Sequence, residues 1–468
     1  MSPAATPTFA VVGHPNKGKS SVVATLTEDA NVVISATPGT TYRADRYEYQ
    51  VQGQALYTLI DTPGFQRAGT VLQWLQARAP ETPDRGAALQ AFVDEFTNTD
   101  RFVDECELLK PILAGAGIIY VVDGTKPYGP EFEQEMEILR WSGQPRMALI
   151  NLIGDGDYVQ AWQRGLDQYF SIVRVFDAMQ ASFASRMQLL SAFGELDETW
   201  RPVLAQVVAT LEAERVRKRG ASAARVAAML WECLQLQLEE QLAPGQTSAS
   251  PAQQATLLDR FKSELATHEQ RSRDTVQAIY QHDSLHYTEA DMALLDEDLF
   301  ATDTWEIFGL SRTQLLASGG ISGAVAGGGL DLLVGGTSLL AGTALGAVVG
   351  GLGAWFGGEE VGKVKVFGST LGGYFVRVGP VANVNFPWVL LGRACLHWQL
   401  VSARNHAVRT HLNADAAAAR NFVQDLTTAE RKPLDQCFAK LRDGDAAQIA
   451  VLSELLNTLF GKLGDPQP

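Results

Sequence analysis

One short motif restricts the fold of this chain more than any other feature. Residues 13–20 read Gly-His-Pro-Asn-Lys-Gly-Lys-Ser, which fits the pattern G-x-x-x-x-G-K-[ST]. An apolar run at residues 9–13 precedes the motif, and a helical pattern begins near Lys19. A loop in this setting directs backbone N–H groups and a helix N-terminus towards phosphate oxygens. The motif therefore predicts an α/β domain whose first loop binds phosphate groups.

The residues of this loop have distinct expected roles. Gly13 and Gly18 allow the backbone to curl around phosphate oxygens. Lys19 is expected to reach the β- and γ-phosphates, and the Ser20 hydroxyl to bind Mg²⁺. The remaining residues expected to contact the nucleotide are Asn16, Lys17 and Ser21.

A second motif, Asp-Thr-Pro-Gly at residues 61–64, follows the apolar run at residues 56–60. At this distance from the first loop, Asp61 is expected to hold Mg²⁺ through a water. The Gly64 amide is expected to sense the γ-phosphate, which gives it a catalytic role.

A threonine-rich loop lies between these two motifs. Residues 37–41 read Thr-Pro-Gly-Thr-Thr and precede a predicted strand. A threonine there can close over the nucleotide and donate its hydroxyl oxygen to Mg²⁺. We favour Thr41 over Thr40 for this catalytic and metal-binding role.

The first 180 residues alternate short apolar runs with amphipathic segments. Strands that are buried on both faces read as continuous apolar runs. Alternation of such strands with helices predicts an α/β fold with a mostly parallel sheet and helices on both faces. The predicted strands cover residues 9–13, 47–51, 56–60, 117–122, 147–152 and 172–176.

The pattern changes along the rest of the chain. From about residue 179 it turns helical, and residues 222–242 show helical spacing that stops at Ala243-Pro244-Gly245. Residues 364–378 read as strands, and a helix is expected from residue 386 onward. The predicted divisions are a nucleotide-binding domain at 1–180, a helical domain at 181–314, a glycine-rich hairpin at 315–358 and a mainly helical region at 359–468.

Composition excludes several classes of protein. The chain has 38 Lys plus Arg and 53 Asp plus Glu, a net charge of −15, so we expect no nucleic-acid partner. Its 4 cysteines show no CxxC spacing, which argues against a disulfide framework or a zinc site. Residues 1–8 show no signal-peptide pattern, so a cytoplasmic location is expected.

Together, the three motifs resemble those of the Era, TrmE and EngA branch of GTPases, over about 180 residues. The resemblance implies GTP and GDP binding, Mg²⁺ dependence and slow GTP hydrolysis. Phe65 stands where Ras-type GTPases carry a water-orienting glutamine, so catalytic help must come from elsewhere. Asn16 occupies the position of the TrmE asparagine that helps bind K⁺. Potassium dependence is thus a hypothesis, and the alternative is that Asn16 bonds only within the loop.

The base-recognition motif of GTPases, [NT]-K-x-D, is degenerate here. Asn151 fits its first position, but Leu152 replaces the lysine and Gly154 the aspartate. Asp155 or Asp157 could read guanine if the loop is shifted, and the alternative is that both are solvated. We expect GTP to be preferred over ATP, mainly from the resemblance.

A further resemblance extends over nearly the whole chain. It is to bacterial GTPases with a C-terminal domain of unknown function, number 3482, in which the fourth motif also tends to keep only its asparagine. The stretches that carry it lie at residues 11–14, 38–41, 101–102, 108–109, 120–123, 135–139, 149–151 and 298–300.

Residues 315–358 form an abrupt glycine-rich block. These 44 residues include 15 glycines and a single charged residue, Asp331. Glycines spaced by four favour close helix packing, and the length suits two helices at about 316–334 and 338–357. We expect a hairpin that engages a membrane, at the inner membrane, or a partner protein. The alternative is a glycine-zipper hairpin packed within a soluble domain.

Other features support weaker expectations. A basic cluster on a predicted helix is read as a solvated face, with anionic headgroups as the alternative. Residues 66–110 are rich in helix formers and continue the second motif, so they could relay the nucleotide state or be a surface insertion. The basic cluster consists of Arg215, Arg217, Lys218, Arg219 and Arg225.

Two rival functions remain for the chain. One is an Era-type ribosome-associated GTPase, and the other is a nucleotide-gated scaffold that scarcely hydrolyses GTP. Whether the protein forms oligomers stays open.

Overall fold

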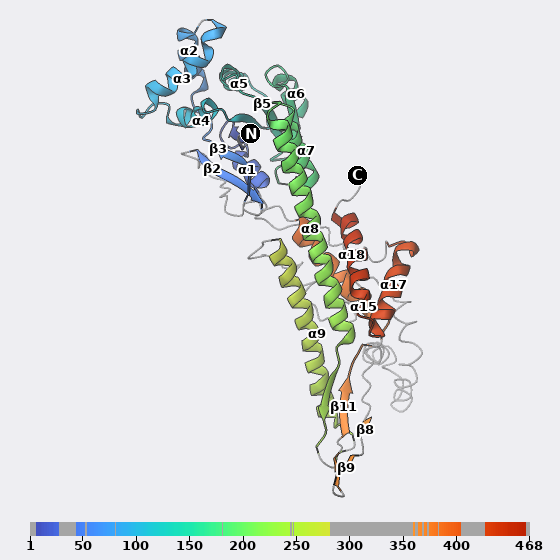
Figure 1. Cartoon of the computed structure of the whole chain (residues 1–468). Coiled ribbons are helices and arrows are strands. Elements are labelled where there is room, and N and C mark those ends of the chain that lie inside the picture. The colour runs from blue at the N-terminus through green and yellow to red at the C-terminus, as the bar shows by residue number, and fades with distance from the viewer. Residues whose placement is uncertain are drawn as a thin grey trace, which may run out of the picture. The chain divides into compact units, whose positions relative to one another are not determined.

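The computed structural model describes the chain in two compact units. The first runs from Met1 to Arg215, and the second contains most of the remainder. The boundary lies inside a helix, α8 (Trp200–Gln235), which Figure 1 shows as one long green helix. The described residues are 6–27, 44–51, 54–79, 81–179, 181–243, 246, 248–280, 359–360, 364–366, 369–371, 374–381, 383–403 and 426–464.

A six-stranded sheet forms the centre of the first unit, in the order β2-β3-β1-β4-β5-β6. β2 pairs with β3 in antiparallel fashion, and every other pairing is parallel. This is the predicted mostly parallel α/β sheet, with each strand within a few residues of its expected position. The strands are β1 (Thr8–Val12), β2 (Asp45–Val51), β3 (Gln54–Asp61), β4 (Gly117–Asp123), β5 (Arg146–Asn151) and β6 (Ile172–Phe176).

Both faces of this sheet are buried, because alternate residues of each strand enter different cores. Ile118 and Tyr120 of β4 pack with the helices α2 to α6. Ile119 and Val121 of the same strand pack on the opposite face with α1 and α7. All four residues are fully buried, which explains why β4 reads as an unbroken apolar run. The helices are α1 (Lys19–Thr27), α2 (Ala68–Arg78), the 3₁₀ helix η1 (Thr82–Asp84), α3 (Arg85–Phe96), α4 (Val103–Leu113), α5 (Glu131–Trp141), α6 (Val159–Leu166) and α7 (Phe183–Gly194).

The first unit extends beyond the predicted boundary at residue 180. Met187, Leu190 and Phe193 of α7 are buried against the sheet, and Leu204 and Val207 of α8 join the same core. Phe193 stacks on Phe9 of β1 with ring centroids 4.3 Å apart. The predicted boundary was placed at residue 180 because the pattern turns helical there. That pattern does not reveal that α7 packs against the sheet of the first unit.

The second unit combines long helices with short antiparallel strands. Its three-stranded sheet has the order β7-β11-β8, and β9 pairs with β10. Residues 238–241 were expected to be helical but form β7, because they pair with residues 375–378 of β11 far along the chain. The elements are the second part of α8, β7 (Leu238–Gln241), α9 (Pro251–Ile279), β8 (Glu359–Glu360), β9 (Val364–Val366), β10 (Ser369–Leu371), β11 (Tyr374–Val378), α15 (Phe386–Ala403), α17 (Thr428–Arg442) and α18 (Gln448–Gly464).

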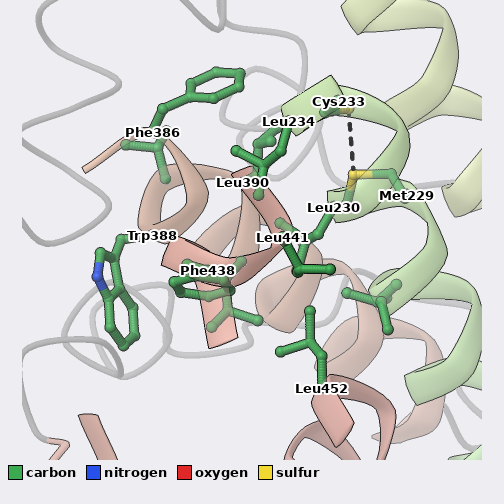
Figure 2. Close-up of a cluster of buried hydrophobic side chains, with 14 of the residues drawn as sticks. Met229, Leu230, Cys233, Leu234, Phe386, Trp388, Leu390, Phe438, Leu441 and Leu452 are labelled. Carbon is green, nitrogen blue, oxygen red and sulfur yellow. Dashed lines mark hydrogen bonds between the residues drawn. The ribbon is translucent and has the colours of Figure 1, made fainter. Parts of the chain in front are cut away.

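One apolar core holds the second unit together. Side chains from α8, α15, α17 and α18 meet in it, as Figure 2 shows for Leu230, Leu390, Leu441 and Leu452. Trp388 and Trp398 of α15 and the adjacent His397 are buried.

Among the described residues, no helix combines the length and the apolar character needed to cross a bilayer. The predicted hairpin at 315–358, including Asp331, lies outside the described residues. The same holds for Thr40 and Thr41.

Candidate functional site

The loop between β1 and α1 has the backbone conformation that its sequence predicts. Gly13 has φ +143° and Gly18 has φ +81°, in the range that favours glycine. A Cβ on Gly13 would lie 2.4 Å from the Val121 carbonyl oxygen, and one on Gly18 would lie 2.2 Å from Nδ2 of Asn151. Asn16 has φ 60°, which asparagine tolerates better than most residues. Its side chain is exposed.

Lys19 is the first residue of α1, and its ammonium turns back into the loop. Nζ donates to the carbonyl oxygens of Gly13 and His14 at 3.3 and 3.2 Å. Burial lowers the pKa of Lys19, and the nearby Asp61 carboxylate opposes that shift. A phosphate oxygen would be a stronger, charged acceptor than these two carbonyls.

Ser20 and Asp61 come together although they lie in different motifs. Parallel pairing sets Val11 of β1 beside Asp61 at the end of β3. The Ser20 hydroxyl donates to Oδ2 of Asp61 at 2.6 Å, and the carboxylate is 3% exposed. Hydroxyl and carboxylate oxygens are the ligands that Mg²⁺ prefers, so these two residues fit the ion. Among the described residues, no three or more His, Cys, Asp or Glu side chains gather in a group that could hold a metal ion.

The Asp-Thr-Pro-Gly segment packs directly on the phosphate-binding loop. The Thr62 hydroxyl donates to the Val11 carbonyl at 2.8 Å. A Cβ on Gly64 would lie 2.6 Å from the backbone nitrogen of Pro15, so only glycine allows this approach. Phe65 is 1% exposed and points into the core rather than towards the loop.

Asn151 joins three loops at the carboxyl edge of the sheet. Its Nδ2 donates to the Lys17 carbonyl at 3.3 Å, and its Oδ1 accepts from the Ala178 amide at 3.1 Å. The Thr25 hydroxyl in turn donates to the Ala178 carbonyl at 2.6 Å. The sequence analysis missed the role of Ala178, although its position two residues after the end of β6, the strand next to β5, could have indicated it.

The remaining residues expected to contact the nucleotide differ in exposure. Asp155 and Asp157 are both exposed, and Oδ1 of Asp157 accepts from the Val159 amide at 3.4 Å, at the start of α6. The Lys17 side chain is buried, with its ammonium 5.4 Å from the ring centre of Phe132. Lys17 therefore contacts Asn151 through its backbone carbonyl oxygen and not through its ammonium. Ser21 is buried within α1.

A buried carboxylate on α5 pairs with a residue of the phosphate-binding loop. Glu135 is 2% exposed, accepts from the Tyr120 hydroxyl at 2.9 Å and pairs with Nδ1 of His14 at 2.8 Å. All three residues lie in stretches that carry the resemblance described above, but their distance along the chain concealed the network itself.

The basic cluster on α8 makes contacts within the protein. The Arg215 guanidinium lies 4.6 Å from the ring centre of Phe183. In the second unit, Arg219 donates to Asn457, and Arg225 pairs with Glu232. These contacts agree better with structural roles than with a free basic surface.

Comparison with known proteins identifies two family regions. A family described as "50S ribosome-binding GTPase" matches residues 8–151, and one described as "Domain of unknown function (DUF3482)" matches residues 163–452. The second match covers more than half of the chain.

Individual relatives cover smaller regions. GTPase Der of Moorella thermoacetica is 29% identical over 165 residues, 35% of this chain and 31% of that protein. GTPase Der of Cupriavidus taiwanensis is 43% identical over 68 residues, 14% of this chain and 15% of that protein. The chain thus spans no more than about a third of either relative.

Among solved structures, a point variant of Aquifex aeolicus Era bound to GDP and AlF₄⁻ aligns with 58% of this chain and 89% of its own. At 15% identity and a TM-score of 0.30, that likeness is too weak to bear on function. The two family matches and the loop geometry agree with each other. The chain belongs to the family of bacterial P-loop GTPases that carry the DUF3482 domain.

Proposed function

We propose that this protein binds GTP and hydrolyses it to GDP and phosphate. The observation that carries the proposal is the convergence of Lys19, Ser20 and Asp61 at one loop. The buried Lys19 ammonium and the Ser20–Asp61 pair, 2.6 Å apart, supply a cation and two oxygen donors beside the phosphate-binding glycines.

The residues of the proposed site have separate roles. Lys19 exchanges its two carbonyl acceptors for phosphate oxygens, and the amides at the start of α1 bind the same groups. Ser20, Asp61 and Thr41 would hold Mg²⁺, which when bound neutralises charge on the phosphate oxygens. Gly64 offers its amide to the γ-phosphate. The buried Phe65 side chain supplies no polar group for an attacking water.

Replacement of Lys19 by alanine tests this proposal. We expect Lys19→Ala to weaken GTP binding at least about a hundredfold and to abolish single-turnover hydrolysis, because a charged phosphate contact is lost. Lys440→Ala, which replaces an exposed lysine on α17, is the matched control and should behave as wild type.

The potassium hypothesis for Asn16 needs a separate experiment. Hydrolysis by the wild type is to be compared in K⁺ and in Na⁺, and equal rates would remove the hypothesis.

We also propose that guanine is preferred and that Asp155 reads it. Asp155 lies in the loop between Asn151 and α6, and it is exposed. GTP and ATP are to be titrated against wild type, Asp155→Ala and Asp157→Ala. Selective loss of GTP affinity in Asp155→Ala supports the assignment, whereas similar affinities of wild type for both nucleotides would refute the preference.

The finer part of the proposal is that the nucleotide state controls a membrane or protein contact through residues 315–358. Its support is the glycine spacing of that block, which suits close helix packing. Liposome flotation without nucleotide, with GDP and with a non-hydrolysable GTP analogue is the test. Absence of the protein from the floated fraction in all three states would refute membrane engagement.

A second candidate function is ribosome association, favoured by the description of the family that matches residues 8–151. The acidic net charge of −15 argues against it. Co-sedimentation with ribosomal subunits that depends on GTP would favour this candidate over membrane engagement.

A further inference from the structure

A buried carboxylate on α4 holds the segment that follows the Asp-Thr-Pro-Gly motif. Glu105 is 2% exposed, and its Oε1 accepts from the backbone amides of Gln66 and Arg67 at 3.1 and 2.7 Å. Among the described residues, no cationic side chain forms an ion pair with Glu105. Burial of a carboxylate without an ion-pair partner is costly, and the two main-chain hydrogen bonds offset only part of that cost. The position of Glu105 therefore suggests a functional reason for its burial.

The same segment is fixed on its other side by the phosphate-binding loop. Thr62 bonds to Val11, and Gly64 packs against Pro15. Between these contacts, Phe65 is buried in the core that α2 to α6 form on one face of the sheet. Residues 62–67 are thus clamped between the loop and α4.

We propose that Glu105 is a positioning residue that keeps the Gly64 amide where it can reach a γ-phosphate. The proposal rests on the proposed function and extends it by naming a residue that favours the binding of GTP over that of GDP. Glu105 bonds only to residues 66 and 67, and none of its hydrogen bonds reaches the loop that holds the other phosphates. Its loss should therefore weaken GTP binding and spare GDP binding.

The test compares Glu105→Ala, Glu105→Gln and Glu105→Asp in the full chain. Calorimetry measures the affinity of each for GDP and for a non-hydrolysable GTP analogue. We expect Glu105→Ala to bind the analogue about tenfold more weakly and GDP within about twofold of wild type. Glu105→Gln should restore most of the loss, because its amide oxygen can accept from both amides. Glu107→Ala, two residues further along α4 and paired with Lys110, is the control that should match wild type.

Two outcomes would overturn the proposal. One is an unchanged ratio of the two affinities in Glu105→Ala, and the other is an equal loss for both nucleotides, which indicates a structural role alone. If Glu105→Ala does not fold, Glu105→Asp decides, because its shorter side chain cannot reach both amides and should give the same selective loss. If wild type binds neither nucleotide, the proposed function itself fails, and this inference fails with it.

Discussion

Gly18 shows how one absent side chain allows two loops to meet. Its positive φ, +81°, suits glycine, and the space that a Cβ would occupy is taken by the Asn151 amide. That amide bonds to Lys17 and Ala178, so it cannot move aside without loss of both bonds. The nucleotide loop and the base-binding end are therefore coupled through contact at a single glycine.

Replacement of Gly18 by alanine should abolish nucleotide binding. We expect a loss of about 2–4 kcal/mol in stability, from backbone strain and from the broken Asn151 hydrogen bonds. Thermal unfolding and GDP titration measure the two effects. Gly143→Ala is the matched control, because Gly143 has φ +69° but a Cβ added there would meet no atom within 4 Å. It should share the strain and keep GDP affinity; tight GDP binding by Gly18→Ala would contradict the account.

At the scale of elements, α9 shows how local sequence sets a helix boundary. Ser250 accepts from the Gln253 amide at 3.3 Å, and Gln253 Oε1 accepts from the Ser250 amide at 2.9 Å. Pro251 follows at the first position of the helix, where its missing N–H costs nothing. Ser250 and Gln253 form a complete capping box, and together with Pro251 they define the start of the helix that packs against α15 in the core of the second unit.

Loss of this cap should destabilise the protein without effect on the nucleotide site. We expect Ser250→Ala to lower the free energy of unfolding by about 1 kcal/mol, since the Gln253 amide loses its acceptor, the Ser250 hydroxyl. Chemical denaturation measures the change, and GDP affinity should be unaltered. Ser263→Ala, at an exposed position in the middle of α9, should be neutral or slightly stabilising. An equal loss in both variants would show that the capping box contributes nothing.

At the scale of the molecule, each unit buries polar groups of its own. The first buries Lys19 and Asp61, which we propose to contact the nucleotide and its metal ion. The second buries His397, 2% exposed, with Nε2 3.3 Å from the amide nitrogen of Gln277. Burial, with a contribution from Arg273, lowers the pKa of His397 to about 3. A neutral imidazole is thus built into the helical core.

This buried imidazole predicts a loss of stability in acid. Unfolded histidine titrates near pH 6.5, so between pH 6.5 and 3 the unfolded chain binds a proton that the folded chain does not. Stability is complete above that range and falls with acidification, by about 2 kcal/mol between pH 7.5 and 5. Denaturation curves at several pH values should show a shallower dependence for His397→Gln than for wild type. Parallel slopes for the two proteins would contradict this assignment.

Much of the first unit was predictable because its signals are local. The strand β4 is an unbroken apolar run, and Gly13, Gly18 and Lys19 carry chemistry that a phosphate-binding loop needs wherever it occurs. The predicted strands and the pairing of Ser20 with Asp61 follow from these signals together with parallel sheet order. Apolar periodicity and glycine spacing are properties of neighbouring residues, so no tertiary information is needed to read them.

Contacts between distant residues were decided only by the folded chain. The Asn151–Lys17 bond joins residues 134 positions apart, and Glu105 meets Gln66 across 39 positions. Residues 238–241 form β7 against a helical pattern because β11 supplies the partner strand. Each of these interactions depends on which segments the folded core places side by side. Local propensity cannot predict the two hydrogen bonds, and at residues 238–241 the partner strand outweighs the helical propensity.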